Sequence, residues 1–82
     1  METIIMVLTI DPRSSHAPKA QTVLTKHGCI IKTRLGLHEV SQNSCSEEGL
    51  IILHIHSSLD EIEVLEKELL DVEGVKVKYM SI

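Results

Sequence analysis

The chain has 82 residues, 43% of them hydrophobic and one aromatic, and its formal net charge is −4. This length supports one domain over residues 1–82, and the hydrophobic fraction is that of a globular protein. The apolar runs are far shorter than the roughly 20 residues of a membrane span, and an acidic chain with almost no aromatic side chains is poorly suited to direct nucleic-acid binding. With two cysteines and no signal-peptide pattern, we expect a cytoplasmic protein.

The first half of the chain predicts a strand, a helix and a second strand. Residues 3–10 are apolar and β-branched and stop just before a proline, as a buried strand does. Ser14 and Ser15 are candidate N-caps for a helix whose apolar residues recur at helical spacing. Gly28 is expected to end this helix in the left-handed conformation. Residues 29–37 then predict the second strand.

The second half repeats this design after a polar segment. Residues 38–48 hold mostly polar side chains and predict a loop, which is long for a hairpin connection. Residues 49–56 predict a third strand. Ser58 and Glu61 have the spacing of a capping box at the start of a helix that ends at the next glycine. Residues 75–80 alternate between apolar and basic side chains and predict the last strand.

The resulting order, βαββαβ, predicts the fold class. A short chain with right-handed crossovers favours an α+β ferredoxin-like sandwich, in which one antiparallel four-stranded sheet has the strand order 4-1-3-2. Both helices are expected on the same face of this sheet. The other face is then left without a covering layer.

Alternation along the strands predicts which side chains occupy the uncovered face. The two central strands place large aliphatic residues and a histidine there: Ile5, Val7, Leu50, Ile52 and His54. Basic residues are expected along the two edges of the same face: Lys76 and Lys78 on one, Lys32 and Arg34 on the other. Such a face suggests that two copies stack into a homo-oligomer. Alternatively, the sheet tolerates a few exposed aliphatic side chains.

Histidines and cysteines are the candidate ligands and nucleophiles. His54 and His56 are two residues apart on one strand, so they point the same way and suit two imidazoles on one metal, or they are polar ends of an apolar strand. His27 falls at the end of the first helix, where a cation is favourable. Cys29 is expected to be buried, whereas Cys45 is expected to be exposed in the loop without a neighbouring cation. With no nucleophile motif, we expect no enzymatic activity.

Three segments resemble a known family of small regulators of the iron-only hydrogenase system, which are similar to ACT domains and to the C-terminal domain of the nickel-responsive repressor NikR. The segments are residues 31–36, 49–53 and 72–78, read with the βαββαβ order. The resemblance implies an ACT-like regulatory fold that forms dimers or tetramers and binds small ligands between subunits. It also implies a role in transcription regulation near hydrogenase.

The resemblance to NikR implies a nickel or other transition-metal site. In that protein a histidine near the end of the first helix precedes an H-x-H motif and a cysteine. His27, His38 and Cys45 match three of these four ligands, while Val40 stands at the position of the second histidine of H-x-H. Glu39 or water would complete a square-planar site.

The resemblance to ACT domains implies an effector-binding turn after the first strand. The turn is typically Asp-x-Pro-Gly, and Asp11, Pro12, Arg13 and Ser14 occupy the matching place here. The aspartate and the proline are present, with the proline one position early, but the glycine is not. A glycine would allow a ligand to approach the backbone closely.

These observations predict a cytoplasmic, non-enzymatic regulatory module that forms a dimer or tetramer through the open sheet face. A small effector or a partner protein would bind between subunits, and any contact with DNA would need a second protein. Three alternatives stay open: a metal sensor, a small enzyme with its site between subunits, and an assembly module without a ligand. Whether residues 38–48 become ordered on binding is a further question.

Overall fold

The computed structural model describes the backbone of residues 1–40 and 45–82, with side chains except at residues 13–14, 37–40 and 45–48. The order βαββαβ is confirmed, with a short 3-10 turn after the first helix. The elements are β1 (Glu2–Ile10), α1 (Arg13–Lys26), η1 (Gly28–Ile30), β2 (Ile31–Val40), β3 (Cys45–Ser57), α2 (Leu59–Leu70) and β4 (Val75–Ser81). The sheet order β2-β3-β1-β4 is the predicted 4-1-3-2 order.

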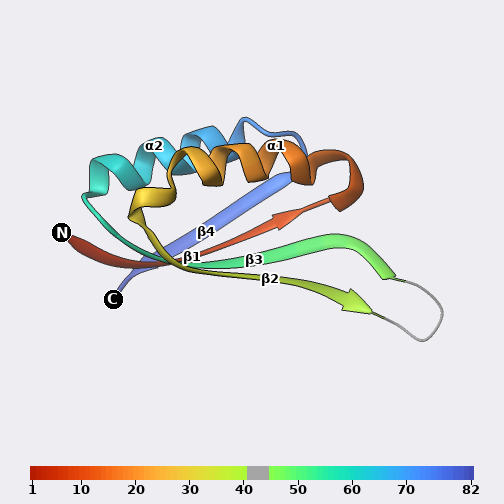
Figure 1. The fold of residues 1–82 in the computed structure, drawn as a ribbon, viewed down its shortest axis with the longest axis horizontal. Helices are drawn as coiled ribbons and strands as arrows, with labels where there is room; N and C mark the ends of the chain where they lie inside the picture. The colour runs from red at the N-terminus through yellow and green to blue at the C-terminus, as the bar shows by residue number, and fades with distance from the viewer. Residues whose placement is uncertain (41–44) are drawn as a thin grey trace.

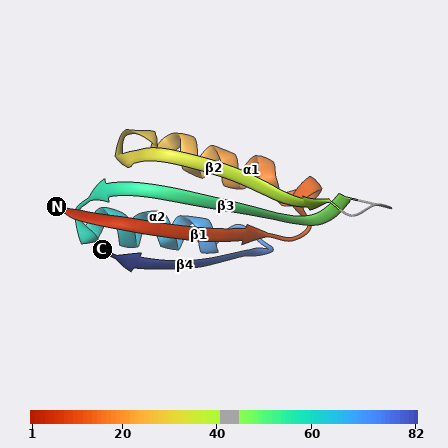
Figure 2. The ribbon, with the colours of Figure 1, turned by 90° about the horizontal axis from the view of Figure 1, so that it is seen from below.

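The fold has two layers, and both helices lie on the same face of the sheet (Figure 1). Seen from below, the four strands have no element in front of them (Figure 2). The ferredoxin-like α+β prediction is therefore confirmed. Within the described ranges, neither helix is long and apolar enough to cross a membrane.

The core lies between the sheet and the helices. Side chains of β1 alternate between buried and half-buried because successive residues of a strand point to opposite faces. The buried set comes from every element of the covered layer: Ile4, Met6, Leu8, Ile10, Ala20, Leu24, Ile51, Leu53, Ile55, Ile62, Leu65, Leu69, Val72 and Val75. The two central strands contribute Ile4, Met6, Leu8 and Ile10 from β1 and Ile51, Leu53 and Ile55 from β3.

The two helices begin differently. At the start of α2 the Ser58 hydroxyl accepts a hydrogen bond from the Glu61 backbone N–H at 3.3 Å, as the capping box predicts. The N-cap of α1 is Pro12, and no side chain caps it. The predicted N-caps Ser14 and Ser15 are wrong, because α1 begins earlier and takes both serines into its first turn.

The end of α1 also departs from the prediction. Gly28 does not adopt a positive φ; instead the chain tightens into η1, where the Ile30 N–H donates to the His27 carbonyl at 3.2 Å. Cys29, predicted to be buried in a strand, is exposed on this turn. The positive φ in the described chain is that of Gly74, 83°, between α2 and β4.

The predicted loop over residues 38–48 is wrong at both ends. Strand β2 continues to Val40 and β3 begins at Cys45, so that His38 pairs with Gly49 and Val40 with Cys45. The hairpin extends beyond the helices (Figure 1). Backbone pairing beyond the helix layer needs no apolar side chains, because the ladder is held by main-chain hydrogen bonds. Residues 41–44 lie outside the described chain, and so does the question of their ordering.

Candidate functional site

The uncovered face is organised in rows of side chains that run across the sheet. On the two central strands Ile5 of β1 pairs with His54 of β3, and Val7 pairs with Ile52. All four side chains are half-buried, as is that of Leu50 in the next row. The structure thus brings the five predicted interface residues together on one surface.

The outer strands add two apolar side chains to this surface. Leu35 of β2 pairs with Ile52 and is 51% exposed, and Met80 of β4 pairs with Ile5 and is 61% exposed. We call the combined surface the apolar patch; it consists of Ile5, Val7, Leu35, Leu50, Ile52 and Met80. A shallow hollow of about 140 Å³ between β1 and β4 is lined by Ile5, Val7, Lys78, Tyr79 and Met80.

Charge is distributed unevenly around the apolar patch. Lys76 pairs with Thr9 and Lys78 with Val7, so both lysines lie on the open face at the β4 edge, as predicted. The prediction of a second basic edge on β2 is wrong for Arg34, which pairs with Leu53 and so lies on the helix side. The open face therefore has two lysines along the β4 edge, whereas the β2 edge has Thr33 and Leu35, with Lys32 on the same side of the strand as Thr33.

A β-bulge in β2 explains this correction. Ile31 pairs with Ile55 and Thr33 pairs with His54, so Lys32 is an extra residue without a counterpart on β3. The insertion reverses the alternation after it. The sequence shows no bulge at this position, and Leu35 was missed as an interface residue for that reason. Met80 could have been found, since it alternates with Lys76 and Lys78.

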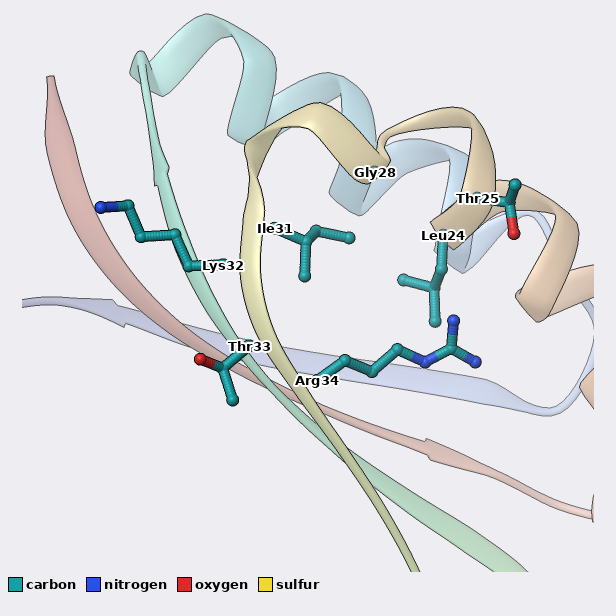
Figure 3. A pocket seen from close by; sticks show the side chains of 7 residues that line it. All are labelled: Leu24, Thr25, Gly28, Ile31, Lys32, Thr33 and Arg34. Carbon is teal, nitrogen blue, oxygen red and sulfur yellow. The ribbon is translucent and has the colours of Figure 1, made fainter.

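On the helix side of β2, Arg34 lines a surface pocket of about 320 Å³ at the end of α1, together with Leu24, Thr25, Gly28, Ile31, Lys32 and Thr33. Figure 3 shows the Arg34 side chain running under the helix towards Leu24 and Thr25, while Lys32 and Thr33 point to the other side of the strand. The two cations therefore do not converge. Arg34 lies instead near the end of α1, where the helix dipole favours a positive charge.

His27 belongs to a contact between the helices. Its Nε2 lies 2.7 Å from one carboxylate oxygen of Glu68, and the Lys26 ammonium lies 2.7 Å from the other. The pKa of Glu68 is lowered from its ordinary 4.5, first by the hydrogen bond from Lys26 and then by that from His27. His27 is largely buried, and the carboxylate already occupies one of its nitrogens.

The three residues of the predicted nickel set do not come together in one chain. His27 follows α1, at the end of the sheet where β2 begins, whereas His38 and Cys45 belong to the far part of the β2–β3 hairpin. The seven steps from Ile31 to His38 along the strand span about 23 Å. The side chains of His38 and Cys45 lie outside the described residues, so this set stays a prediction that would need more than one subunit. The described part of the chain contains no cluster of three or more His, Cys, Asp or Glu residues suited to a metal.

The predicted effector turn packs against the chain itself. The Asp11 N–H donates to the Gly74 carbonyl at 3.0 Å, and a side-chain Cβ at Gly74 would overlap the Asp11 carbonyl oxygen. Asp11 and Pro12 are exposed and joined by a cis peptide bond, while Arg13 and Ser14 begin α1 and their side chains are not described. Effector binding at this turn stays a prediction.

Comparison with solved structures identifies the fold. The uncharacterized protein TM1266 from Thermotoga maritima superposes with a TM-score of 0.84 at 20% identity, over 99% of this chain and 96% of that one. CPII, a nitrogen regulatory PII-like protein from Thiomonas intermedia K12 bound to ADP, AMP and bicarbonate, gives 0.60 at 13% identity, over 100% and 93%. The divalent ion tolerance protein CutA1 from Ehrlichia chaffeensis gives 0.56 at 15% identity, over 100% and 83%.

These likenesses show a shared ferredoxin-like fold. No protein-family model matches the chain, and no curated protein matches it by sequence. The open face is therefore the feature of this chain from which a function can be inferred.

Proposed function

We propose that the protein is a non-enzymatic regulatory module that forms a homo-oligomer by stacking the open faces of two sheets. The observation that carries the proposal is the apolar patch: six aliphatic or thioether side chains on four adjacent strands, with no element of the described chain in front of them. A scattered exposed aliphatic is ordinary, but a contiguous patch of this kind is typical of an interface.

The energy available from the apolar patch is sufficient for association. Full burial of one aliphatic side chain contributes about 1.5–3 kcal/mol, so completing the burial of four half-buried and two exposed side chains on each copy contributes roughly 10–20 kcal/mol. Association costs about 4–15 kcal/mol in lost translational and rotational freedom. The middle of the first range exceeds the middle of the second, so burial of the apolar patch offsets the cost of association at central values.

The open face is small compared with a standard interface, so a stable stack must bury all of it. Four strands about 4.8 Å apart, with paired segments about 20 Å long, span roughly 400 Å² in projection. A standard interface buries about 800 Å² of accessible surface on each partner. A stable stack must therefore include the full width of the sheet, from Leu35 on β2 to Met80 on β4.

The position of the lysines selects one orientation of the stack. A two-fold axis across the strands would place the β4 edge of one copy over the β4 edge of the other. The lysines at positions 76 and 78 would then face the same two lysines of the second copy. An axis along the strands places β4 over β2 of the partner, where Thr33 and Leu35 lie. The second orientation separates the lysines of the two β4 edges from each other, which reduces repulsion between like charges, and lets the lysine stems cover apolar surface.

A charge in the middle of the apolar patch tests the proposal. Val7→Glu places a carboxylate beside Lys78, its pairing neighbour, which supports the fold of the monomer while opposing burial in a stack. Val64→Glu, on the exposed side of α2, is a matched control because it changes the net charge equally. Sedimentation should show an oligomer for the wild type and Val64→Glu, and a monomer for Val7→Glu. A monomeric wild type, or an oligomer unaffected by Val7→Glu, would contradict the proposal.

The biological role that we propose follows the resemblance to regulators of the iron-only hydrogenase system. A small effector or a partner protein would bind between subunits and shift the assembly equilibrium, and a second protein would supply contact with DNA. CPII provides a precedent for a regulatory protein of this fold class bound to small molecules. Deleting the gene should change hydrogenase transcript levels, and Val7→Glu should fail to restore them where Val64→Glu succeeds. Unchanged transcripts would contradict this role.

A further inference from the structure

His54 and His56 lie on the open face beside the apolar patch, and we propose that they form half of a transition-metal site that the same two residues of a second copy complete. The inference rests on the proposed stacking of two sheets. Neither histidine belongs to the set that the NikR resemblance suggests.

The two imidazoles share one face and one strand. His54 pairs with Ile5 and Thr33, and His56 pairs with Thr3, so their cross-strand neighbours are apolar or hydroxyl side chains rather than carboxylates. Both side chains are half-buried. This contrasts with His27, whose Nε2 is already 2.7 Å from a Glu68 carboxylate oxygen. Two histidines in i, i+2 positions of a strand can direct their ring nitrogens to a common point.

One chain leaves such a site half complete. Two imidazoles provide two of the four ligands of a tetrahedral ion, and the described residues offer no third histidine, cysteine or carboxylate for the same cluster. The stack supplies the missing ligands. With the two-fold axis along the strands, the rows keep their positions, so that the His54 and His56 rows of one copy lie over the same rows of the other.

The spacing of the stacked strands fits a metal. Stacked sheets lie about 10 Å apart, neighbouring strands about 4.8 Å apart, and residues i and i+2 about 6.7 Å apart. If β3 of each copy lies over β1 of the other, the point midway between the four histidine Cα atoms is about 6.5 Å from each of them. A histidine Nε2 lies about 4.5 Å from its own Cα and binds zinc at 2.0–2.1 Å, which covers this distance.

The ligand class follows from the donors. Four neutral imidazoles suit a borderline divalent ion of the first transition row, such as Zn²⁺, Ni²⁺ or Cu²⁺, rather than Mg²⁺ or Ca²⁺. Ile5 and Ile52 flank His54 and would limit the access of water. Metal binding would couple directly to assembly, since a complete site exists in the dimer and not in the monomer.

Chelator-stripped protein titrated with Zn²⁺ or Ni²⁺ tests the proposal, with native mass spectrometry for stoichiometry and sedimentation for the dimerisation constant. We expect one metal per two chains and dimerisation at least about tenfold tighter with metal. His54→Gln and His56→Gln should each abolish this tightening, and His56→Gln, which lies outside the five predicted interface residues, should keep the metal-free dimerisation of the wild type. His16→Gln, which alters a histidine of α1 away from the open face, is the matched control and should behave as the wild type.

Different results would overturn the two proposals separately. A dimer that binds no added metal would overturn the shared site and leave the stacking intact. The same conclusion would follow if His16→Gln lost metal binding as fully as His54→Gln and His56→Gln. One metal on each monomeric chain would also overturn it. A monomer at all concentrations, with and without metal, would overturn the stacking itself. Circular dichroism of each variant would distinguish a loss of metal binding from a loss of fold.

Discussion

Neighbouring residues of β1 lie in opposite environments although their side chains are chemically alike. Met6 and Leu8 are fully buried under the helices, whereas Ile5 and Val7 on the same strand are half-buried on the open face. The covered face is closed by parts of the same chain, and the open face has equivalent side chains with no helix or strand of the described residues above them. Hydrophobicity therefore does not distinguish a core from an interface; the position of the helices does.

The largest expected change in stability comes from shortening two neighbouring side chains of β3, one on each face of the sheet. Leu53 is fully buried on the covered face, and Leu53→Ala should lower the free energy of unfolding by about 2–5 kcal/mol. Ile52→Ala, next to it on the open face, should lower it by about 1 kcal/mol or less in dilute solution, where the chain is monomeric. Chemical denaturation over a range of protein concentrations would measure both.

The two truncations should also respond differently to protein concentration. The effect of Ile52→Ala should increase as the wild type associates, because the interface then stabilises the wild type alone. The effect of Leu53→Ala should persist at every concentration. Equal effects of the two truncations in dilute solution would show that the open face is also a core.

A second test concerns the turn that joins the covered layer to the sheet. Gly74 has a φ of 83° and its Cα faces the Asp11 carbonyl oxygen, so Gly74→Ala is both strained and obstructed. We expect a loss of about 1–3 kcal/mol in the free energy of unfolding. Gly36→Ala is the control, because a Cβ at Gly36 meets no atom within 4 Å, and it should change stability by less. Thermal melting of both variants would decide; equal losses would contradict this account.

The smallest effect is expected from the contact between the helices. The pKa of Glu68 is lowered by Lys26 and His27, so its contribution to stability is present above the ordinary value of 4.5 and is lost as the pH falls below it. Melting temperatures measured from pH 7 to pH 3 should therefore decrease less in Glu68→Gln than in the wild type. Glu66→Gln serves as the control. A wild-type decrease no larger than that of Glu68→Gln would exclude this contribution.

Sequence patterns were sufficient for the fold and for the centre of the open face. The period-two alternation of residues 3–10 and 49–56, together with the capping box at Ser58, is local information that the packing preserves. The β-bulge at Lys32 is not visible in this way, because an inserted residue changes the face of every later side chain without altering composition. Arg34 was misplaced and Leu35 overlooked for this single reason.

Segments outside the helix layer were the hardest to predict. The polar residues after His38 resemble a loop because hydrophobic alternation identifies a strand that packs against another layer. This part of the hairpin extends beyond the helices, so its strands lack that pattern. The backbone nevertheless pairs as far as Val40 and Cys45. The candidate ligands His38 and Cys45 fall in this part of the chain, so their roles stay predictions.

The position of β1 in the sheet has a consequence for biosynthesis. It is made before the other three strands of the sheet, but its two neighbours are β3 and β4, which are made much later. Ile4 pairs with Ile55 and with Ser81, so β1 has no partner strand until β3 has been synthesised, and it is paired on both sides only after β4 has been synthesised. Contacts between such distant residues slow folding. During that interval β1 exposes apolar side chains on both faces, and it is the segment of the nascent chain most in need of protection from aggregation.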